Sequence, residues 1–227
     1  MTKVDFDEHA GTYRETLNAC FAPFGGKDTF FDSYKIDCIK QWVAADNQAY
    51  DILDYGCGIG KITGPLAKEF QQSTVHGWDI SRESLRVARE ENRELKNIHF
   101  IDELSPEQKY NFIIVVMVFH HIKPDERVSV LLEMKKLLKP GGKIVIFEHN
   151  PLNPVTRYIV SACPFDADAE LILRNKFVAL AKLSGFEVEF KRHILFFPWP
   201  AKLFRNIERL LRFIPLGAQY MLILAPK

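Results

Sequence analysis

The chain has 227 residues, a length that suits one medium-sized domain with appendages. Its 30 lysines and arginines nearly balance its 29 aspartates and glutamates. The resulting net charge of +1 gives no electrostatic footprint for nucleic acid or for an anionic membrane surface, so we expect a small-molecule partner and no nucleic acid.

The cysteines and the apolar runs indicate where in the cell the protein is expected to be. The four cysteines form no C-x-x-C pair and have no histidine close by at metal-ligand spacing, so we expect no metal and a reducing, cytoplasmic location. The N-terminus is acidic and lacks the apolar core of a signal peptide. The longest strongly apolar run, "FIIVVMVF", is too short to span a bilayer.

Residues 1–48 precede the regular part of the sequence, and we interpret them as a helical N-terminal cap interrupted at Gly25 and Gly26. Aromatic side chains in this region are candidates for a lid over a substrate, with Tyr13 as the chosen substrate contact. The aromatic set is Tyr13, Phe30, Phe31 and Tyr34.

From residue 51 onward, short apolar segments alternate with segments of helical periodicity, which is typical of βαβ units. Strands are predicted at 52–55, 74–78 and 98–102, and helices at 61–70 and 81–95, the second capped by Ser81. The run 111–119 has no polar alternation, which indicates a strand buried on both faces beside the first strand.

The second half continues with a helix over 124–138, ended by "KPGG", and another buried strand at 143–148. Residues 151–170 are expected to form a substrate-side insertion before a helix over 169–185, in which Asp166 caps the helix. The segments 186–197 and 219–227 are predicted to pair as antiparallel strands at a sheet edge. Between them, the helical segment at about 199–216 favours core packing or a dimer face over peripheral membrane contact.

The fold class that follows is α/β. We expect a doubly wound, mostly parallel seven-stranded sheet with helices on both faces and an antiparallel pair at the C-terminal edge. The domain would span 49–227.

The stretch "DILDYGCGIG" places Gly56, Gly58 and Gly60 directly after the first strand, where doubly wound sheets bind ligands. The dinucleotide pattern G-x-G-x-x-G fails because Lys61 stands where the third glycine belongs, and a P-loop needs a different gap and ending.

Two carboxylates indicate the ligand of this loop. Asp54 at its entrance would repel a pyrophosphate and suits a cationic ligand better. Asp79 follows the second strand, where a carboxylate can accept hydrogen bonds from both hydroxyls of a ribose. The ligand is therefore expected to be a nucleoside.

These motifs resemble the class I S-adenosylmethionine-dependent methyltransferases over residues 48–150, in the order glycine loop, Asp79, Asp102, the strand before "HHI", and "LLKPGGKIVIFE". The resemblance implies a Rossmann-like methyltransferase fold, S-adenosylmethionine (SAM) as cofactor and S-adenosylhomocysteine (SAH) as product. It further implies that Asp79 binds the ribose, that Ile80 packs on the adenine and that Asp102 approaches the adenine amino group. The complete cofactor set expected is Asp54, Gly56, Cys57, Gly58, Gly60, Asp79, Ile80, Asp102 and Val116.

The chemistry of methyl transfer points to side chains at the same sheet edge. His120 and His121 follow the fourth strand and are the candidate catalytic bases, with only one of them expected to face the pocket. His149 and Asn150 follow the fifth strand and are candidate substrate contacts.

The resulting prediction is a SAM-dependent methyltransferase that acts on an oxygen or nitrogen of a small molecule, such as a sugar, a secondary metabolite or a lipid-linked substrate. Two alternatives stay open at this point: an NAD(P)-dependent oxidoreductase and a non-catalytic nucleoside-binding module. Whether the chain forms a homodimer stays open too.

Overall fold

A computed structural model describes residues 4, 6–21, 28–43, 48–197, 207–208, 210–211 and 214–227. The predicted break at Gly25 and Gly26 and most of the predicted helical segment 199–216 lie outside the described residues.

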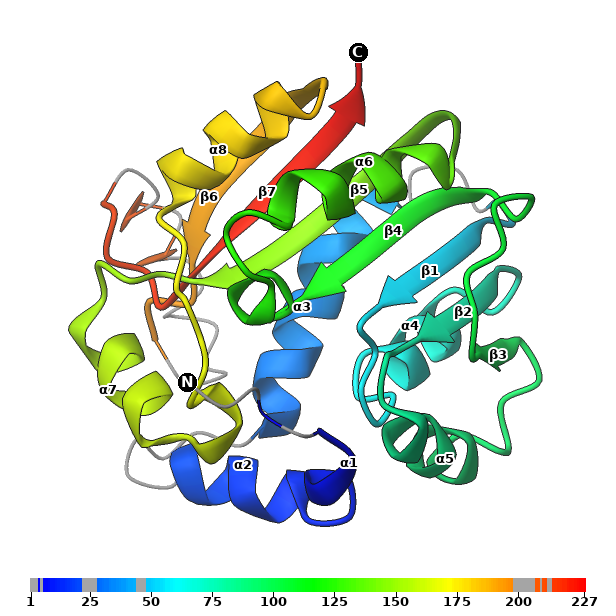
Figure 1. The fold of residues 1–227 in the computed structure, drawn as a ribbon, viewed down its shortest axis with the longest axis horizontal. Helices are drawn as coiled ribbons and strands as arrows, with labels where there is room; N and C mark the ends of the chain where they lie inside the picture. The colour runs from blue at the N-terminus through cyan, green and yellow to red at the C-terminus, as the bar shows by residue number, and fades with distance from the viewer. Residues whose placement is uncertain are drawn as a thin grey trace.

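Seven strands form one sheet in the order β3-β2-β1-β4-β5-β7-β6 (Figure 1). Strands β1 to β5 run parallel, whereas β7 is antiparallel to both of its neighbours, β5 and β6. This arrangement confirms the predicted fold class, including β4 as the neighbour of β1. The strand bounds are β1 Asp51–Tyr55, β2 Thr74–Trp78, β3 Ile98–Ile101, β4 Tyr110–Val116, β5 Leu138–His149, β6 Phe186–Ile194 and β7 Gln219–Pro226.

Eight α-helices and two described 3₁₀ helices connect the strands within the described part of the chain. Their bounds are α1 Phe6–His9, α2 Tyr13–Phe21, α3 Asp28–Val43, α4 Thr63–Glu69, α5 Arg82–Glu91, η2 Phe119–His121, α6 Arg127–Lys136, α7 Pro154–Ala162, η3 Pro164–Asp166 and α8 Arg174–Leu183. Ser81 caps α5 as predicted, because its hydroxyl accepts a hydrogen bond from the Ser84 amide.

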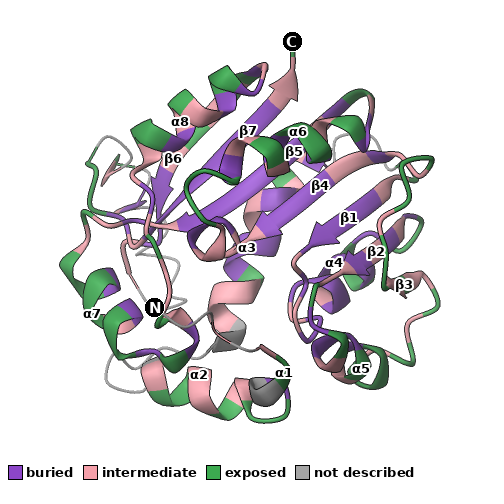
Figure 2. Cartoon of the chain, viewed as in Figure 1, coloured by how far each residue is buried: buried purple, intermediate pink, exposed green. Residues whose placement is uncertain are grey.

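The core lies on both faces of the sheet, and the central strands are buried along most of their length (Figure 2). One face packs against α6 and α8, and the other against α3 and α4. Strand β4 is apolar without alternation because helices cover both of its sides.

The N-terminal region divides into two parts with different roles. Helix α3 buries Ile39 and Val43 against the sheet, so it belongs to a core layer and not only to a cap. Helices α1 and α2 lie beyond the carboxyl ends of β1 and β4, with α1 next to α5 and α2 next to α7 (Figure 1). Helices α1, α2 and α7 therefore stand over the sheet edge at which the sequence predicts a ligand.

The helix predicted over 169–185 begins only at Arg174. The residues before it are held in a non-helical path, since the Glu170 amide donates to the His120 carbonyl and the Arg127 guanidinium donates to the Glu170 carbonyl. These bonds tie the segment to the end of β4. No described helix is long and apolar enough to cross a bilayer, and the four cysteines are free thiols.

Candidate functional site

A cavity of about 380 Å³ lies at the carboxyl ends of the parallel strands. Its walls come from α1 to α3, the loop after β1, the ends of β2, β4 and β5, and η3. Among the predicted residues, those that line it are Tyr13, Asp54, Gly56, Cys57, Gly58, Asp79, Ile80, Val116, His120, His121 and His149. The volume falls within the range of small-molecule sites.

The glycine loop forms a tight turn in which Gly56, Gly58 and Gly60 all have positive φ angles. A side chain on Gly58 would meet no atom within 4 Å, so this part of the loop is open. A side chain on Gly60 would instead collide with Asn92 and approach Phe100. Gly60 does not line the cavity. Its lack of a side chain allows the loop to pack closely against Asn92 at the end of α5.

Gly56→Ala is expected to destabilise the protein more than Gly58→Ala. Both substitutions place an alanine at positive φ, which costs about 1–2 kcal/mol. Only at Gly56 would the new Cβ lie 2.5 Å from a Val118 methyl carbon, and relieving that overlap costs a further ~1–3 kcal/mol. Urea unfolding of both variants measures the difference, and equal losses would contradict the packing seen at Gly56.

Asp54 is buried at the loop entrance, where the Thr63 hydroxyl donates a 2.7 Å hydrogen bond to its carboxylate. Burial raises the pKa of Asp54 to about 7, although the bond from Thr63 opposes the shift. A cationic group in the cavity would stabilise the ionised form. The role of Asp54 toward a positively charged ligand stays a prediction.

Two backbone amides hold the Asp79 carboxylate, one in the glycine loop and one at the start of α5. Its Oδ2 accepts a 2.7 Å bond from the Gly58 amide, and its Oδ1 accepts a 2.9 Å bond from the Ser81 amide. Burial raises the pKa of Asp79, and the amide hydrogen bonds oppose that rise. Next to it, Ile80 lines the cavity with a side chain that is 63% exposed, as a platform for an apolar ring would require.

Asp102 does not take the position that the resemblance implied. It does not line the cavity, and both its carboxylate oxygens accept 3.0 Å bonds from the Arg89 guanidinium. The pair is exposed on α5 and the segment after β3. Arg89 therefore turns this carboxylate toward the surface and away from the cavity.

His120 lies on η2 and is almost completely buried, with carboxylates at both ring nitrogens. Its Nδ1 lies 2.7 Å from Glu148 Oε2, and its Nε2 lies 3.3 Å from Asp166 Oδ1. Burial by itself would lower the pKa of His120, but Glu148 and Asp166 outweigh it and raise the pKa to about 10. Since neither nitrogen is left for an acceptor's proton, the geometry does not support His120 as a general base.

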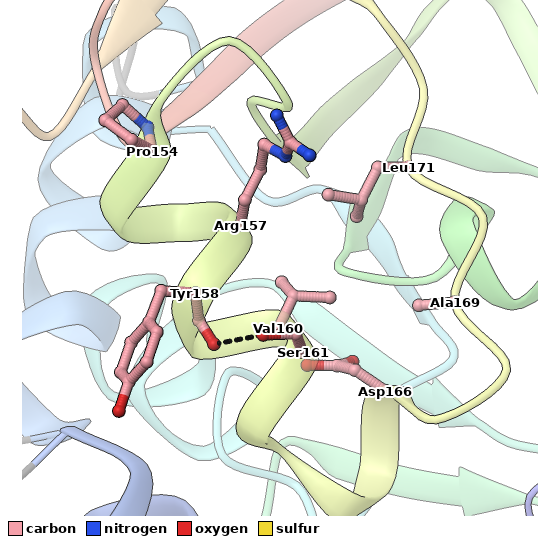
Figure 3. Close-up of a pocket in the computed structure, with 8 residues that line it drawn as sticks. All are labelled: Pro154, Arg157, Tyr158, Val160, Ser161, Asp166, Ala169 and Leu171. Carbon is pink, nitrogen blue, oxygen red and sulfur yellow. Dashed lines mark hydrogen bonds between the residues drawn. The ribbon is translucent and has the colours of Figure 1, made fainter.

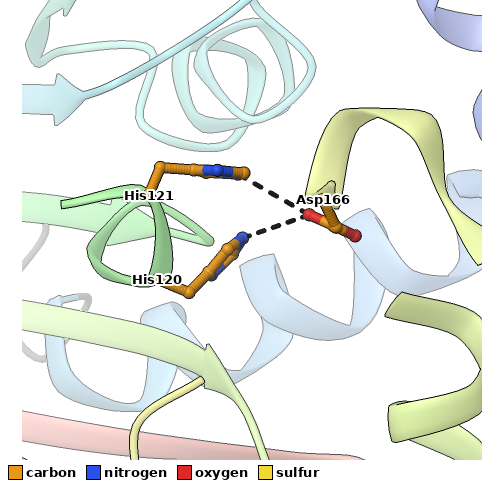
Figure 4. A group of neighbouring side chains, drawn as sticks. All are labelled: His120, His121 and Asp166. Atoms are coloured by element: carbon orange, nitrogen blue, oxygen red, sulfur yellow. Dashed lines mark ion pairs between the residues drawn. The ribbon is translucent and has the colours of Figure 1, made fainter. Parts of the chain in front are cut away.

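His121 faces the same carboxylate as His120, contrary to the expectation that only one of them reaches the pocket (Figure 4). Its Nδ1 lies 3.0 Å from Asp168 Oδ1, and its Nε2 lies 3.6 Å from Asp166 Oδ1. Adjacent side chains diverge by about 180° in a strand but by only about 120° in a 3₁₀ helix. The predicted cap role of Asp166 is wrong, because its carboxylate binds these imidazoles.

The two residues after β5 have different roles. His149 lines the cavity, and its buried Nδ1 has no hydrogen-bond partner among the described residues. Burial and the neighbouring His120 lower the pKa of His149 to about 4. Asn150 is not a substrate contact, since its buried amide donates to the carbonyls of Pro215 and Gly217 and thereby fixes the chain before β7.

Tyr13 lines the cavity from α2, with its ring stacked on Phe165 at a centroid distance of 4.6 Å. Burial is the main cause of its raised pKa, so the hydroxyl stays protonated. The pairing joins the N-terminal helices to the insertion after β5. Both elements therefore contribute an aromatic ring to one wall of the cavity.

Four charged residues near the cavity were not selected from the sequence: Lys35, Glu148, Asp166 and Asp168. Lys35 is buried on α3 and lines the cavity. Glu148 ends the fifth predicted strand, and its apolar surroundings gave no sign of a partner. The available signal was the pair Asp166 and Asp168 in the loop after Pro164, since polar loop residues carry function more often than core residues.

A second cavity, of about 500 Å³, forms a surface groove between α7 and the segment 166–171 (Figure 3). Arg157, Tyr158 and Leu171 are among the residues that line it. Asp166 lines both this groove and the main cavity. Asp166 therefore stands between the groove and the main cavity.

Comparison with known proteins shows that the sequence is similar to methyltransferases. Residues 52–142 match a family model described as a methyltransferase domain. Malonyl-[acyl-carrier protein] O-methyltransferase 1 of Ilyobacter polytropus is 28% identical over 152 residues, which are 65% of this chain and 55% of that protein. Demethylmenaquinone methyltransferase of Lactococcus lactis is 30% identical over 53% of this chain and 52% of its own length. The chain thus spans about half the length of these curated relatives.

Solved structures share the fold over almost the whole chain. A TehB-like SAM-dependent methyltransferase from Corynebacterium glutamicum aligns with a TM-score of 0.64 at 19% identity, covering 97% of this chain and 99% of its own. Magnesium protoporphyrin IX methyltransferase from Synechocystis, solved with bound SAH, aligns with a TM-score of 0.64 at 16% identity over 98% and 100%. At these identities the likeness concerns the fold.

Proposed function

We propose that this chain, which belongs to the class I S-adenosylmethionine-dependent methyltransferases by its domain at 52–142 and its fold, methylates an oxygen or nitrogen of a small molecule. The observation that carries the proposal is the single cavity in which the loop with Asp54 and Asp79 meets a wall of histidines and aromatic rings. The loop with Asp54 and Asp79 suits a cationic nucleoside, and the wall of histidines and aromatic rings suits a nucleophilic acceptor.

The residues present fit SAM at the cofactor end of this cavity. The buried carboxylate of Asp54 suits the ammonium of the methionine part, and the open face of Gly58 leaves room for it. Asp79 would accept hydrogen bonds from the ribose, with the adenine on Ile80. When bound, SAM supplies an electrophilic methyl group on a sulfonium.

The remaining wall would position the acceptor. Methyl transfer needs an aligned nucleophile and the exclusion of water. The stacked rings of Tyr13 and Phe165 supply an apolar surface that would hold the acceptor in place and keep water out. His149 is the preferred polar contact, because its buried Nδ1 has no partner in the part of the chain that the structure describes and can bond to the acceptor's reacting group. The four free cysteines support a cytoplasmic setting.

The proposal is tested by methyl transfer from radiolabelled SAM to fractionated small-molecule extracts. We expect label in a low-mass fraction, and a fall in turnover of about 10²-fold or more for His149→Ala with SAM affinity within about twofold of wild type. Asp102→Asn, outside the cavity, serves as the matched control and is expected to keep full turnover. Tight SAM binding with no labelled product in any fraction would favour a non-catalytic nucleoside-binding module.

A further inference from the structure

We propose that His120, His121 and Asp166 form a binding site for one divalent transition-metal ion at the acceptor side of the cavity. Among the described residues, these three form a group whose potential ligand atoms all lie within 4.8 Å of one another. Two imidazole nitrogens and one carboxylate oxygen are a donor set typical of Zn²⁺, Fe²⁺, Co²⁺ and Mn²⁺. This inference reverses the expectation from the sequence, in which the histidine pair and Asp166 are 45 residues apart.

Two of the three donor distances are close to those of a coordination shell. Metal bonds of about 2.1 Å at tetrahedral to octahedral angles place neighbouring ligand atoms about 3.0–3.5 Å apart. The Nε2 atoms of His120 and His121 lie 3.3 and 3.6 Å from Asp166 Oδ1. Figure 4 shows both rings turned toward that one oxygen, so a small shift of the side chains would let all three donors face one ion.

The outer hydrogen bonds fix both rings for ligation. His120 Nδ1 lies 2.7 Å from Glu148, and His121 Nδ1 lies 3.0 Å from Asp168. Histidines that bind metals usually donate the other ring N–H to a carboxylate, which sets the tautomer and directs the free nitrogen to the ion. Here both histidines have that support.

The charges around the cluster favour a cation as well. Three carboxylates, those of Glu148, Asp166 and Asp168, surround two imidazoles in a largely buried region. A divalent ion between the imidazoles and Asp166 would take the place of the proton that His120 Nε2 shares with Asp166, and it would offset more of this negative charge than that proton does.

The site would have open coordination positions because it has three protein ligands. All three ligands line the cavity, so a fourth position there can take a donor atom of the methyl acceptor. Resting on the proposed function, this points to an acceptor with an acidic hydroxyl or a carboxylate, since an ion bound to that oxygen favours its deprotonated, nucleophilic form. The site therefore narrows the acceptor from oxygen or nitrogen to oxygen.

Cobalt(II) titration of chelator-stripped protein tests the site without an activity assay. We expect one Co²⁺ per chain, visible-region absorption typical of four- or five-coordinate Co²⁺, and loss of that absorption when Zn²⁺ is added. His121→Ala should weaken Co²⁺ binding more than about 100-fold, and Asp168→Asn about 10-fold through the lost support of the ring. His99→Ala, an exposed histidine outside the cavity, is the control and should bind as wild type does.

Each variant is checked for SAH affinity and far-UV circular dichroism, so that a misfolded protein is not mistaken for a lost ligand. Unchanged Co²⁺ affinity in His121→Ala, or no Co²⁺ absorption in wild type at about 1 mM metal, would overturn the metal site. Loss of SAH binding with the Co²⁺ site intact would instead count against the proposed function.

Discussion

Asp79→Asn is expected to weaken SAH binding by about 10- to 100-fold. The asparagine has the size of the aspartate but one acceptor oxygen in place of two, and the Gly58 and Ser81 amides already use both carboxylate oxygens. The ribose bonds are charge-assisted, and losing them costs about 1.5–3 kcal/mol. Isothermal titration calorimetry of wild type and variant measures the ratio directly.

Asp102→Asn is the matched control for this experiment. The family resemblance assigns both carboxylates to the nucleoside, but the structure pairs Asp102 with Arg89 outside the cavity. We expect its SAH affinity to stay within about twofold of wild type, since exposed ion pairs contribute little. Comparable losses in both variants would contradict the assignment of Asp79 alone to the ribose.

Glu148→Ala is expected to reduce the free energy of unfolding by about 3–5 kcal/mol. The buried carboxylate accepts hydrogen bonds from the Val118 and Phe119 amides and pairs with His120. Its removal leaves two backbone donors and the Nδ1 of His120 without this partner in the core. Chemical denaturation at neutral pH measures the loss.

Two further variants distinguish the loss of these buried hydrogen bonds from the effect of removing any carboxylate. Glu148→Gln keeps the volume and one acceptor oxygen, so its loss should be smaller than that of Glu148→Ala. Glu189→Ala removes a carboxylate that pairs with Lys143 on the surface, and it should cost less than about 1 kcal/mol. A Glu148→Ala variant as stable as Glu189→Ala would mean that the carboxylate does not hold η2 in place.

The features that the sequence predicted correctly have local causes. The alternation of apolar strands with amphipathic helices yielded the sheet and its antiparallel pair, because burial on one or both faces determines that period. The glycine loop was predicted from the spacing of three glycines directly after the first strand, and in the structure each of them has a positive φ angle.

The features that were missed depend on contacts between distant segments. Asp166 and Asp168 reach the histidines only because residues after α7 fold back over the end of β4. Asn150 lies at the sheet edge where ligands bind, but its side-chain amide donates a hydrogen bond to the backbone before β7. Asp102 follows a strand as Asp79 does, and only Arg89 on α5 distinguishes the two.

Calorimetric titration of the wild-type protein with SAH, followed by competition with NADH, tests the central claim most directly. The account predicts one SAH per chain, bound at the loop of Asp54 and Asp79, with no displacement by NADH. Heat from NADH with none from SAH would contradict it and would assign the cavity to a dinucleotide.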